Sequence, residues 1–470
     1  MYKSTACLIF CLLFTLACQT EKGPAPVTWV DTQDWEGWAE VDSVRCGFLE
    51  VPEDHFQDDS PRIKVAFAIF EARNSNPEVP PVIMLTGGPG GRSLNWPGRW
   101  ENHSLRADRD IIVIEQRGIG LSSPLVRSGE AFMDILAADL NSTEEKVATR
   151  NLMKRISKEI KESGQDPAKY NTIQNAHDLG LLMQALDYPK YCLSGSSYGT
   201  KYGMYTMKYF PEYIHASILN APATLSGNAL ENRIPDYLRS LNLLFAECAK
   251  DPDCQGQHPD LKTEMIDAVN TLEDNPITID LADRRYTINP QDAMYFLRYQ
   301  LYNAQGFKLA PQFIAAIKNR DTLTLKEISA GPSQMLRVGN MSAFISFQAY
   351  EEFSTTTAEQ TAKAIAAAPE LSAGFAWFQS IIPEMAYWHD SRISPEEHHL
   401  EGISIPTLII VNEFDPVTPP ENTKLFEAAL ENATVIRLQR FGHGAGGDCI
   451  RQMEKDFLRD PNAKLDRSCL

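Results

Sequence analysis

The chain has 470 residues, of which 44 are basic and 62 acidic, and 43% are apolar. This length fits one large domain with an insertion, or two domains. The ordinary apolar fraction excludes a disordered chain, and the net charge of −18 argues against a nucleic-acid partner, which requires a basic face. Since no run of about 18 apolar residues follows the N-terminus, we expect no internal membrane span. These features favour an acidic globular enzyme.

The first residues have the pattern of an export signal. Lys3 precedes a mostly apolar run, which predicts a signal peptide over residues 1–17. The ending TLAC (15–18) resembles a bacterial lipobox, so Cys18 is expected to be acylated; an ordinary cleaved signal with an incidental cysteine is the alternative. We therefore expect an exported protein of the bacterial periplasm or cell envelope, in contact with a membrane only through its N-terminal lipid.

Six cysteines remain after the signal peptide, and an even number in an oxidising compartment predicts disulfides. Metal ligation is the rival interpretation, but no CxxC pair or nearby set of histidines completes a site, so no metal is expected. Cys46 and Cys192 form either a third bridge or two buried thiols, and the sequence leaves this open. The expected bridges join cysteines that flank a short segment: Cys248 with Cys254, and Cys449 with Cys469.

The pattern of apolar residues predicts an α/β fold in residues 41–224. Short runs rich in β-branched residues alternate there with helical stretches. Such alternation implies a mostly parallel sheet flanked by helices on both faces. We expect strands at 63–70, 82–88, 111–118, 191–197 and 217–222, and a helix at 175–186.

Residues 225–402 are predominantly helical in pattern, with few strand signals. The sheet pattern returns in residues 403–470, with strands expected at 407–415 and 433–444 and a closing helix. A helical block that interrupts a sheet predicts an inserted cap, or lid, over the α/β core.

Ser197 has the sequence context of an activated nucleophile. The segment GSSYG (195–199) follows a predicted strand and precedes a helical stretch, and its two glycines permit the tight turn that exposes a serine hydroxyl. Ser196 is the competing serine but lacks glycines two residues to either side. A turn of small residues without any chemical role is the other alternative.

A serine hydroxyl needs a general base that is oriented by a carboxylate. When a nucleophile occupies such a strand-to-helix turn, the three residues follow the chain order serine, acid, histidine. His443, between glycines after a late strand, is the predicted base, and Asp415, at the end of the strand at 407–415, the predicted acid. Glu413 is the alternative acid, and a capping role is the alternative for Asp415.

The glycine-rich loop TGGPGG (86–91) follows a buried strand, so its backbone amides can face a developing oxyanion. The amide of Tyr198, directly after the nucleophile, is the expected second donor. A phosphate-binding role is disfavoured because GKS or GKT is missing and Pro89 has no amide hydrogen.

Taken together, these motifs resemble the α/β-hydrolase aminopeptidases, the group of proline iminopeptidase and tripeptidyl aminopeptidase, over residues 41–470. The resemblance implies an α/β-hydrolase fold with a helical cap and no cofactor. It assigns Ser197 as nucleophile, His443 as base and Asp415 as its orienter, Gly88 and Tyr198 as the oxyanion hole, and Arg117 as a brace at the site entrance. The motifs that carry it are GGPGG (87–91), EQRGIGLSSP (115–124), GSSYGT (195–200), DPVTPP (415–420) and GHG (442–444).

The same resemblance implies that glutamates of the cap bind the free α-ammonium group of a peptide. The candidates are Glu351, Glu352 and Glu384, and the alternative is that these side chains are simply solvated. We expect peptide substrates with a free N-terminus, from which single residues or short units such as tripeptides are released through an acyl-enzyme on Ser197. An esterase or lipase with the same triad is the main alternative, and a non-catalytic binding module on a hydrolase scaffold is the other. The sequence does not predict the oligomeric state.

Overall fold

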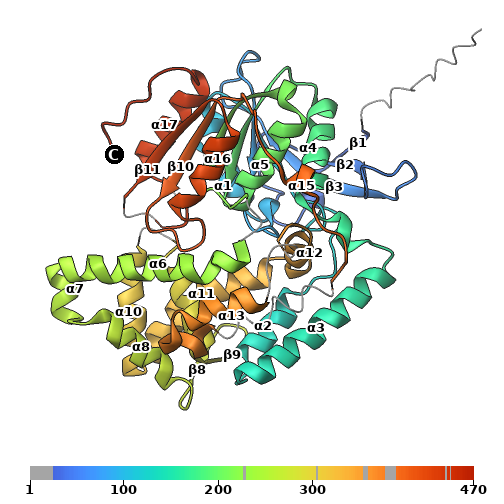
Figure 1. Cartoon of the computed structure of the whole chain (residues 1–470). Coiled ribbons are helices and arrows are strands. Elements are labelled where there is room, and N and C mark those ends of the chain that lie inside the picture. Colours follow the sequence, from blue (N-terminus) through green and yellow to red (C-terminus); the bar gives the residue numbers. More distant parts are fainter. Residues whose placement is uncertain are drawn as a thin grey trace, which may run out of the picture.

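The computed structural model describes residues 25–225, 229–302, 305–352, 358–375, 388–439, 442–444 and 446–470. These residues form an α/β body with a largely helical cap against one end of its sheet (Figure 1). The predicted signal peptide (1–17), the predicted lipid site Cys18 and the candidate Glu384 lie outside the described residues.

A sheet of nine strands forms the centre of the α/β body, in the order β1-β2-β3-β5-β4-β6-β7-β10-β11. Neighbours from β1 to β5 pair antiparallel, and all neighbours from β5 to β11 pair parallel. The mostly parallel sheet is therefore confirmed. The strands are β1 (Val27–Val30), β2 (Val44–Pro52), β3 (Arg62–Phe70), β4 (Val82–Leu85), β5 (Ile111–Ile114), β6 (Tyr191–Ser196), β7 (Ile214–Asn220), β10 (Thr407–Asn412) and β11 (Ala433–Leu438).

Helices cover both faces of this sheet because its central strands alternate apolar side chains between two cores. In β4, Ile83 and Leu85 join one buried cluster, and Val82 and Met84 join the other. The first cluster includes residues of α4 (Thr172–Leu186), α5 (Tyr198–Tyr209) and α16 (Thr423–Ala429). The second includes residues of α1 (Pro97–Glu101) and α17 (Asp448–Arg459).

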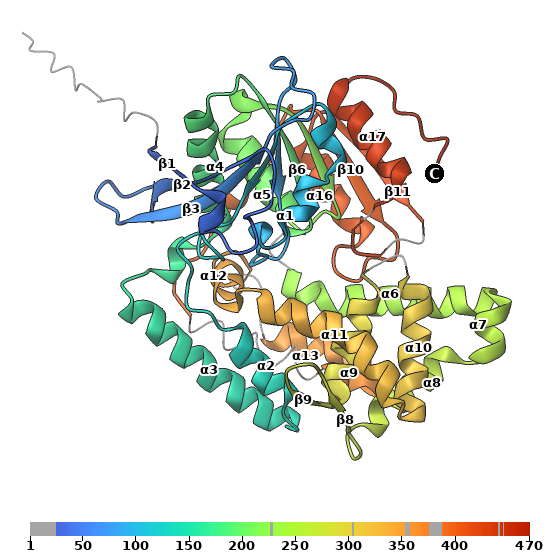
Figure 2. The ribbon, with the colours of Figure 1, turned by 180° about the vertical axis from the view of Figure 1, so that it is seen from behind.

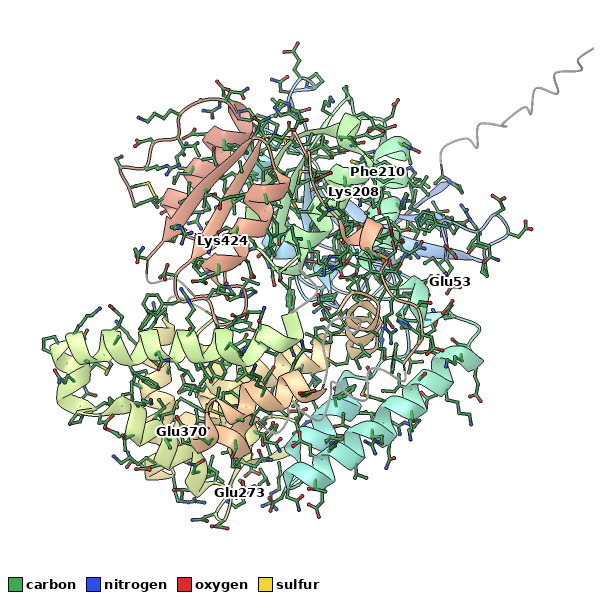
Figure 3. The ribbon with its side chains drawn as sticks, in the orientation of Figure 1. Glu53, Lys208, Phe210, Glu273, Glu370 and Lys424 are labelled. Carbon is green, nitrogen blue, oxygen red and sulfur yellow. A yellow bond between two sulfur atoms is a disulfide. The ribbon has the colours of Figure 1, made fainter. Side chains whose placement is uncertain are left out.

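The cap has its own apolar core and lies below the α/β body in both views (Figures 1 and 2). Glu273 and Glu370 mark its part far from the sheet (Figure 3). A short antiparallel hairpin, which the sequence did not predict, joins the helices. The cap elements are α6 (Ala229–Lys250), α7 (Pro252–Gln257), α8 (Leu261–Thr271), β8 (Ile277–Asp280), β9 (Arg285–Ile288), α9 (Pro290–Gln300), α10 (Gly306–Asn319), α11 (Thr322–Val338), α12 (Met341–Glu351) and α13 (Ala358–Ala366).

Some helices pack with the other body than the one expected from their place in the sequence. In α2 (Gly129–Ala137), Met133 and Leu136 join the apolar core of the cap, although this segment precedes β6 and was expected in the α/β core. Figures 1 and 2 show α2 and α3 (Ser142–Glu162) beside the cap helices. Conversely, Ala343 and Phe347 of α12 belong to the core beneath the sheet. The period of a helix indicates that one face is buried but not against which layer it packs.

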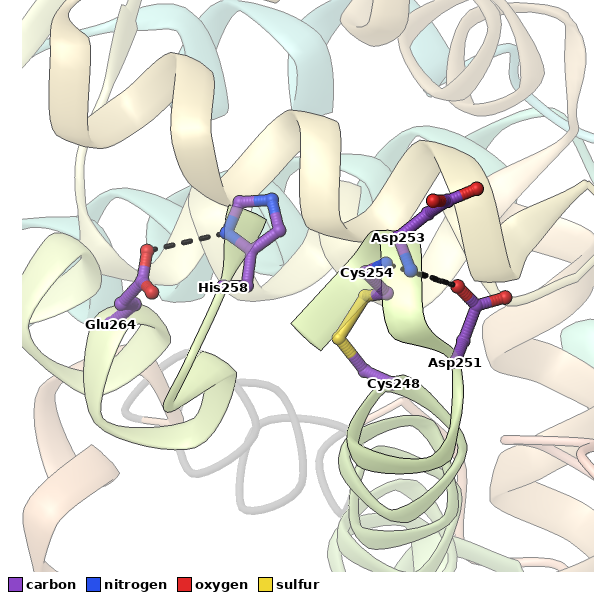
Figure 4. Close-up of a disulfide and its surroundings, with 6 residues drawn as sticks. All are labelled: Cys248, Asp251, Asp253, Cys254, His258 and Glu264. Carbon is purple, nitrogen blue, oxygen red and sulfur yellow. Dashed lines mark hydrogen bonds and ion pairs between the residues drawn. A yellow bond between two sulfur atoms is a disulfide. The ribbon is translucent and has the colours of Figure 1, made fainter. Parts of the chain in front are cut away.

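Both predicted cysteine pairs are bonded in the structure, Cys248 with Cys254 and Cys449 with Cys469. Figure 4 shows the first bridge at the junction of α6 and α7, where the Asp251 carboxylate accepts hydrogen bonds from the amides of Asp253 (2.9 Å) and Cys254 (3.0 Å) and so caps α7.

Cys46 and Cys192 are separate buried thiols, which resolves the question that the sequence left open. Burial raises the pKa of Cys46 to about 12 and that of Cys192 to about 11, so both stay protonated. Within the described ranges, no three His, Cys, Asp or Glu side chains are grouped as metal ligands would be. No helix in the same ranges combines the length and apolarity needed to cross a membrane.

Candidate active site

Ser197 occupies a sharp turn between β6 and α5, with φ 56° and ψ −126°. A positive φ at a non-glycine residue is strained, and such strain is concentrated at functional sites. A Cβ on Gly199 would lie 1.9 Å from the Leu85 carbonyl oxygen, and one on Gly195 would lie 2.4 Å from the Gly199 oxygen. The two flanking glycines are therefore required for the turn. Ser196 is the last residue of the strand and does not occupy the turn.

His443 and Asp415 form the second part of the predicted triad. Nδ1 of His443 lies 2.8 Å from Oδ2 of Asp415, whose carboxylate is fully buried. The amides of Val417 and Thr418 each donate to its Oδ1 at 2.8 Å, and the Thr418 hydroxyl donates to Oδ2 at 2.6 Å. Because Nδ1 faces the carboxylate, Nε2 is the imidazole nitrogen that can act as base.

The environment keeps Asp415 ionised. Burial alone would raise the pKa of its carboxyl, but the charge of His443 and the hydrogen bonds from His443 and Thr418 hold that pKa below its usual value. The alternative acid, Glu413, instead forms an ion pair with Arg239 at 2.7 Å. Sequence reasoning did not single out Thr418, although a hydroxyl three residues after an aspartate at the end of a strand is a signal for this kind of turn.

A cavity of about 90 Å³ is lined by Ser197, the predicted nucleophile. It brings together five residues that the sequence predicted: Gly88, Ser197, Tyr198, Glu351 and Glu352. The buried Thr418 also lines it and connects the cavity to Asp415 and His443. Four ionisable side chains in its wall were not foreseen, namely Lys201, Arg233, Asp236 and Arg298. A larger cavity of about 380 Å³ lies along α3, and no triad residue lines it.

The glycine-rich loop is held tightly against the nucleophile. A Cβ on Gly87 would lie 3.0 Å from Cβ of Ser197, and Gly88 has φ +120°. The amide side chain of Gln116 fastens the loop, since its Nε2 donates to the Thr86 carbonyl at 3.0 Å and its Oε1 accepts from the Gly90 amide at 3.4 Å. Gly87 therefore lies against Ser197, Gly88 lines the same cavity as Ser197, and the oxyanion hole of Gly88 and Tyr198 stays a prediction.

Glu351 and Glu352 are buried and share one cation. Nζ of Lys201 lies 2.9 Å from Oε2 of Glu351 and 3.0 Å from Oε1 of Glu352, and all three side chains are at most 3% exposed. Glu351 also accepts from the amide of Thr172 at 2.9 Å. Burial would lower the pKa of Lys201, but the two carboxylates raise it above its usual value, so it is charged. Lys201 was detectable only through its position, one helical turn after Ser197.

Arg117 lies in the interior and not at the entrance of the site. Its side chain is fully buried, and Nη2 lies 2.6 Å from Oδ1 of Asp178. Its guanidinium also donates to the carbonyl oxygens of Pro52 at 3.1 Å and Lys169 at 2.8 Å. The expectation that Arg117 braces the site entrance was therefore wrong about its location. The five N–H donors of a guanidinium suit a buried junction of three chain segments.

Residues 80–447 match the family described as alpha/beta hydrolase fold. The chain belongs to this family. It is a hydrolase whose site has the geometry of a serine hydrolase, with Ser197 in the strained turn and His443 bound to Asp415.

Similar proteins include peptidases at low identity. The chain is 27% identical over 202 residues to a tripeptidyl aminopeptidase of Streptomyces lividans, which covers 40% of this chain and 38% of that protein. It is 25% identical over 242 residues to the serine protease Hip1 of Mycobacterium tuberculosis, which covers 49% of this chain and 46% of that protein. The chain thus spans less than half the length of these relatives. A solved structure of proline iminopeptidase from Mycobacterium smegmatis is 13% identical, with a TM-score of 0.40, and the match covers 88% of this chain and 98% of that one.

Proposed function

We propose that this protein is an exported serine aminopeptidase that removes short N-terminal units from peptides. The observation that carries the proposal is the buried pair Glu351 and Glu352, which lines the same cavity as Ser197. Two carboxylates share the single ammonium of Lys201, so the group keeps a net negative charge. The α-ammonium group of a substrate would neutralise it beside the nucleophile.

The chemistry follows from the triad. Oγ of Ser197 attacks the carbonyl carbon while Nε2 of His443 takes the hydroxyl proton, and the resulting oxyanion is stabilised by the amides of Gly88 and Tyr198. The tetrahedral intermediate collapses, and the amine leaves with the proton from His443. Water then attacks the acyl-enzyme with the same histidine as base, which releases the N-terminal unit as a carboxylic acid and restores Ser197.

Three further observations support the proposal. Cap residues of α6, α9 and α12 form part of the wall of the cavity at Ser197, which restricts access and favours the end of a chain over the middle of a folded one. A relative named tripeptidyl aminopeptidase aligns with two-fifths of the chain. Two disulfides and the predicted signal at residues 1–17 favour export, since such bridges persist in oxidising compartments. Membrane attachment through Cys18 is part of the proposal and rests on the lipobox pattern.

The test is hydrolysis of a small panel by the purified protein. The panel contains proline, alanine and tripeptide chromogenic amides with free and blocked N-termini, and a short-chain ester. We expect cleavage of free amides and not of blocked ones, and the best free amide identifies the unit released. Cleavage of the ester alone, whatever the state of the amino group, would contradict an aminopeptidase and indicate an esterase.

Two serine variants connect the activity to the site. Ser197→Ala should lower kcat by about 10⁴-fold or more, while Ser196→Ala, its exposed neighbour, should retain the wild-type rate. Glu352→Gln tests the amino-group anchor, because it should reduce the ratio of free to blocked amide cleavage. The exposed Glu396→Gln is its control. An unchanged ratio in Glu352→Gln would refute the role of this carboxylate.

A further inference from the structure

Two arginine side chains of the cap line the cavity of Ser197 and form no ion pair with a carboxylate of the residues that the structure describes. Arg233 on α6 and Arg298 on α9 both line this cavity. Among the described residues, the guanidinium of Arg233 makes no ion pair or hydrogen bond, and that of Arg298 donates only to the Pro416 carbonyl, at 3.4 Å. By contrast, Arg239, further along α6, pairs with Glu413 at 2.7 Å. The two arginines that face the cavity therefore retain unused donors.

The charges around this pair leave it electropositive. Burial, and then the neighbouring charge of Arg298, lower the pKa of Arg233 to about 10, so the side chain is still protonated at neutral pH. Asp236 also lines the cavity, but burial raises the pKa of its carboxyl to about 7, so it is only partly ionised there. Glu352 is near enough to oppose the shift of Arg233, yet its carboxylate is bound to Lys201. The cavity therefore has two cationic guanidinium groups beside the group of Glu351, Glu352 and Lys201, whose single excess negative charge does not balance both arginines.

We propose that Arg233 and Arg298 bind a carboxylate of the substrate. A planar guanidinium binds a carboxylate through two parallel hydrogen bonds, which fixes its position as well as its charge. The carboxylate is either the C-terminus of a short peptide or the side chain of an acidic residue. This inference deepens the proposed function, because a free amino group and a carboxylate in one small cavity describe short or acidic peptides as the substrate class.

The experiment compares substrates that differ in one carboxylate. The first arm uses trialanine and its C-terminal amide, both without a chromophore. The second arm uses alanyl-glutamate and alanyl-glutamine, both as the same chromogenic amide. We expect kcat/KM to favour the acid over its neutral partner by about ten- to hundredfold in one of the arms. The arm that shows the preference identifies whether the C-terminus or a side chain is recognised.

Variants connect the preference to the arginines. Arg233→Gln should reduce it to about twofold or less, chiefly through KM for the acid substrate, while Arg233→Lys should retain part of it. Arg285→Gln, at a side chain that is 80% exposed on the cap, removes the same charge and should leave the preference intact. The rate at which an uncharged fluorophosphonate labels Ser197 shows whether each variant keeps a folded site. A preference that persists in Arg233→Gln, or no preference in either arm, would overturn the proposal.

A third arm separates this inference from the proposed function. It compares a chromogenic ester that ends in a carboxylate with the same ester in uncharged form. Such esters can be tested on any serine hydrolase, whether or not it cleaves peptides. If peptides are not cleaved but the acidic ester is favoured and Arg233→Gln removes that preference, the aminopeptidase proposal fails and the carboxylate site stands. If peptides with a free N-terminus are cleaved equally well with and without the carboxylate, the aminopeptidase proposal stands and the carboxylate site fails.

Discussion

The ring of Tyr302 lies 5.0 Å from the imidazole ring of His443, so the cap contacts the predicted base directly. Tyr302 follows α9 and packs on Tyr299 with ring centroids 5.3 Å apart. The residue before Tyr302, Leu301, has its carbonyl group close to Gly442. A Cβ on Gly442 would lie 1.9 Å from the Leu301 oxygen. The segment that ends α9 therefore contacts both Gly442 and His443, and the cap contributes to the position of the base as well as covering the cavity.

The contact predicts a role for the tyrosine ring and not for its hydroxyl. Aromatic pairs contribute about 0.5–1.5 kcal/mol, so Tyr302→Ala should lower kcat by about two- to tenfold. Tyr302→Phe keeps the ring and should stay close to the wild type. Steady-state kinetics on the best substrate, with pH profiles of kcat, would measure both variants. Equal losses in Ala and Phe would show that the hydroxyl, and not ring packing, is what matters.

Gly442 gives a sharper test of the same relationship. Gly442→Ala must displace either the His443 loop or the end of α9, because the new Cβ would collide with the Leu301 oxygen. A displacement of about 1 Å can lower the rate by about a hundredfold. Gly446→Ala is the matched control, because a Cβ at Gly446 meets no atom within 4 Å. Comparable rates for the two variants would mean that the cap and the histidine loop tolerate the shift independently.

Ser197, Asp415 and His443 could be singled out from the sequence because their signals are local. A strained turn needs glycines at fixed positions around Ser197, and strand ends with short turns mark Asp415 and His443. Lys201 could be noticed only by its place one helical turn after Ser197, and nothing in the sequence revealed its partners Glu351 and Glu352. Tyr302 was not predictable, since a tyrosine in a helical pattern has no feature that reveals a distant partner such as His443. Their roles depend on how α12 packs against α5 and how α9 meets the last strands.

In the sheet and the cap, too, local features were predictable from the sequence and the packing between distant segments was not. The parallel strands were predicted because buried β-branched runs are visible one by one, and the position of the helical block follows from the interruption. The packing of α2 with the cap was not predicted, because Met133 and Leu136 look like any buried helix face. The β8–β9 hairpin was missed because each of its four-residue strands alternates buried and more exposed residues, whereas the equally short β4 and β5 are apolar and buried at every position.

Glu115 predicts a pH dependence of stability. Its carboxyl is 1% exposed, and burial raises its pKa to about 7, partly opposed by hydrogen bonds from the amides of Leu121 and Leu94. Between the usual pKa of a glutamate and pH 7, the folded state holds a proton that the unfolded state releases. The free energy of unfolding contributed by this group is therefore highest at acidic pH and falls as the pH rises through that window.

Glu115→Gln removes this titration while its amide oxygen still accepts from Leu121, which donates at 2.6 Å in the wild type. We expect the stability of the variant relative to wild type to rise by roughly 2–3 kcal/mol between pH 4.5 and pH 8. Denaturant unfolding at several pH values would measure this difference. The exposed Glu78→Gln should follow the wild-type curve. Parallel curves for wild type and Glu115→Gln would show that the buried carboxyl does not titrate in this range.

The two disulfides should differ in their contribution to stability. Cys449 and Cys469 are 20 residues apart and Cys248 and Cys254 only 6, and the chain-entropy model assigns the longer loop about 3 kcal/mol and the shorter about 2 kcal/mol. The longer bridge also holds the C-terminal segment, whose Leu465 packs in the core beside α17. Cys469→Ser should therefore lower the free energy of unfolding more than Cys254→Ser does, and a reducing agent should lower Tm in the wild type. The opposite order of the two variants would mean that residual structure in the unfolded cap, and not loop length, determines what each bridge contributes.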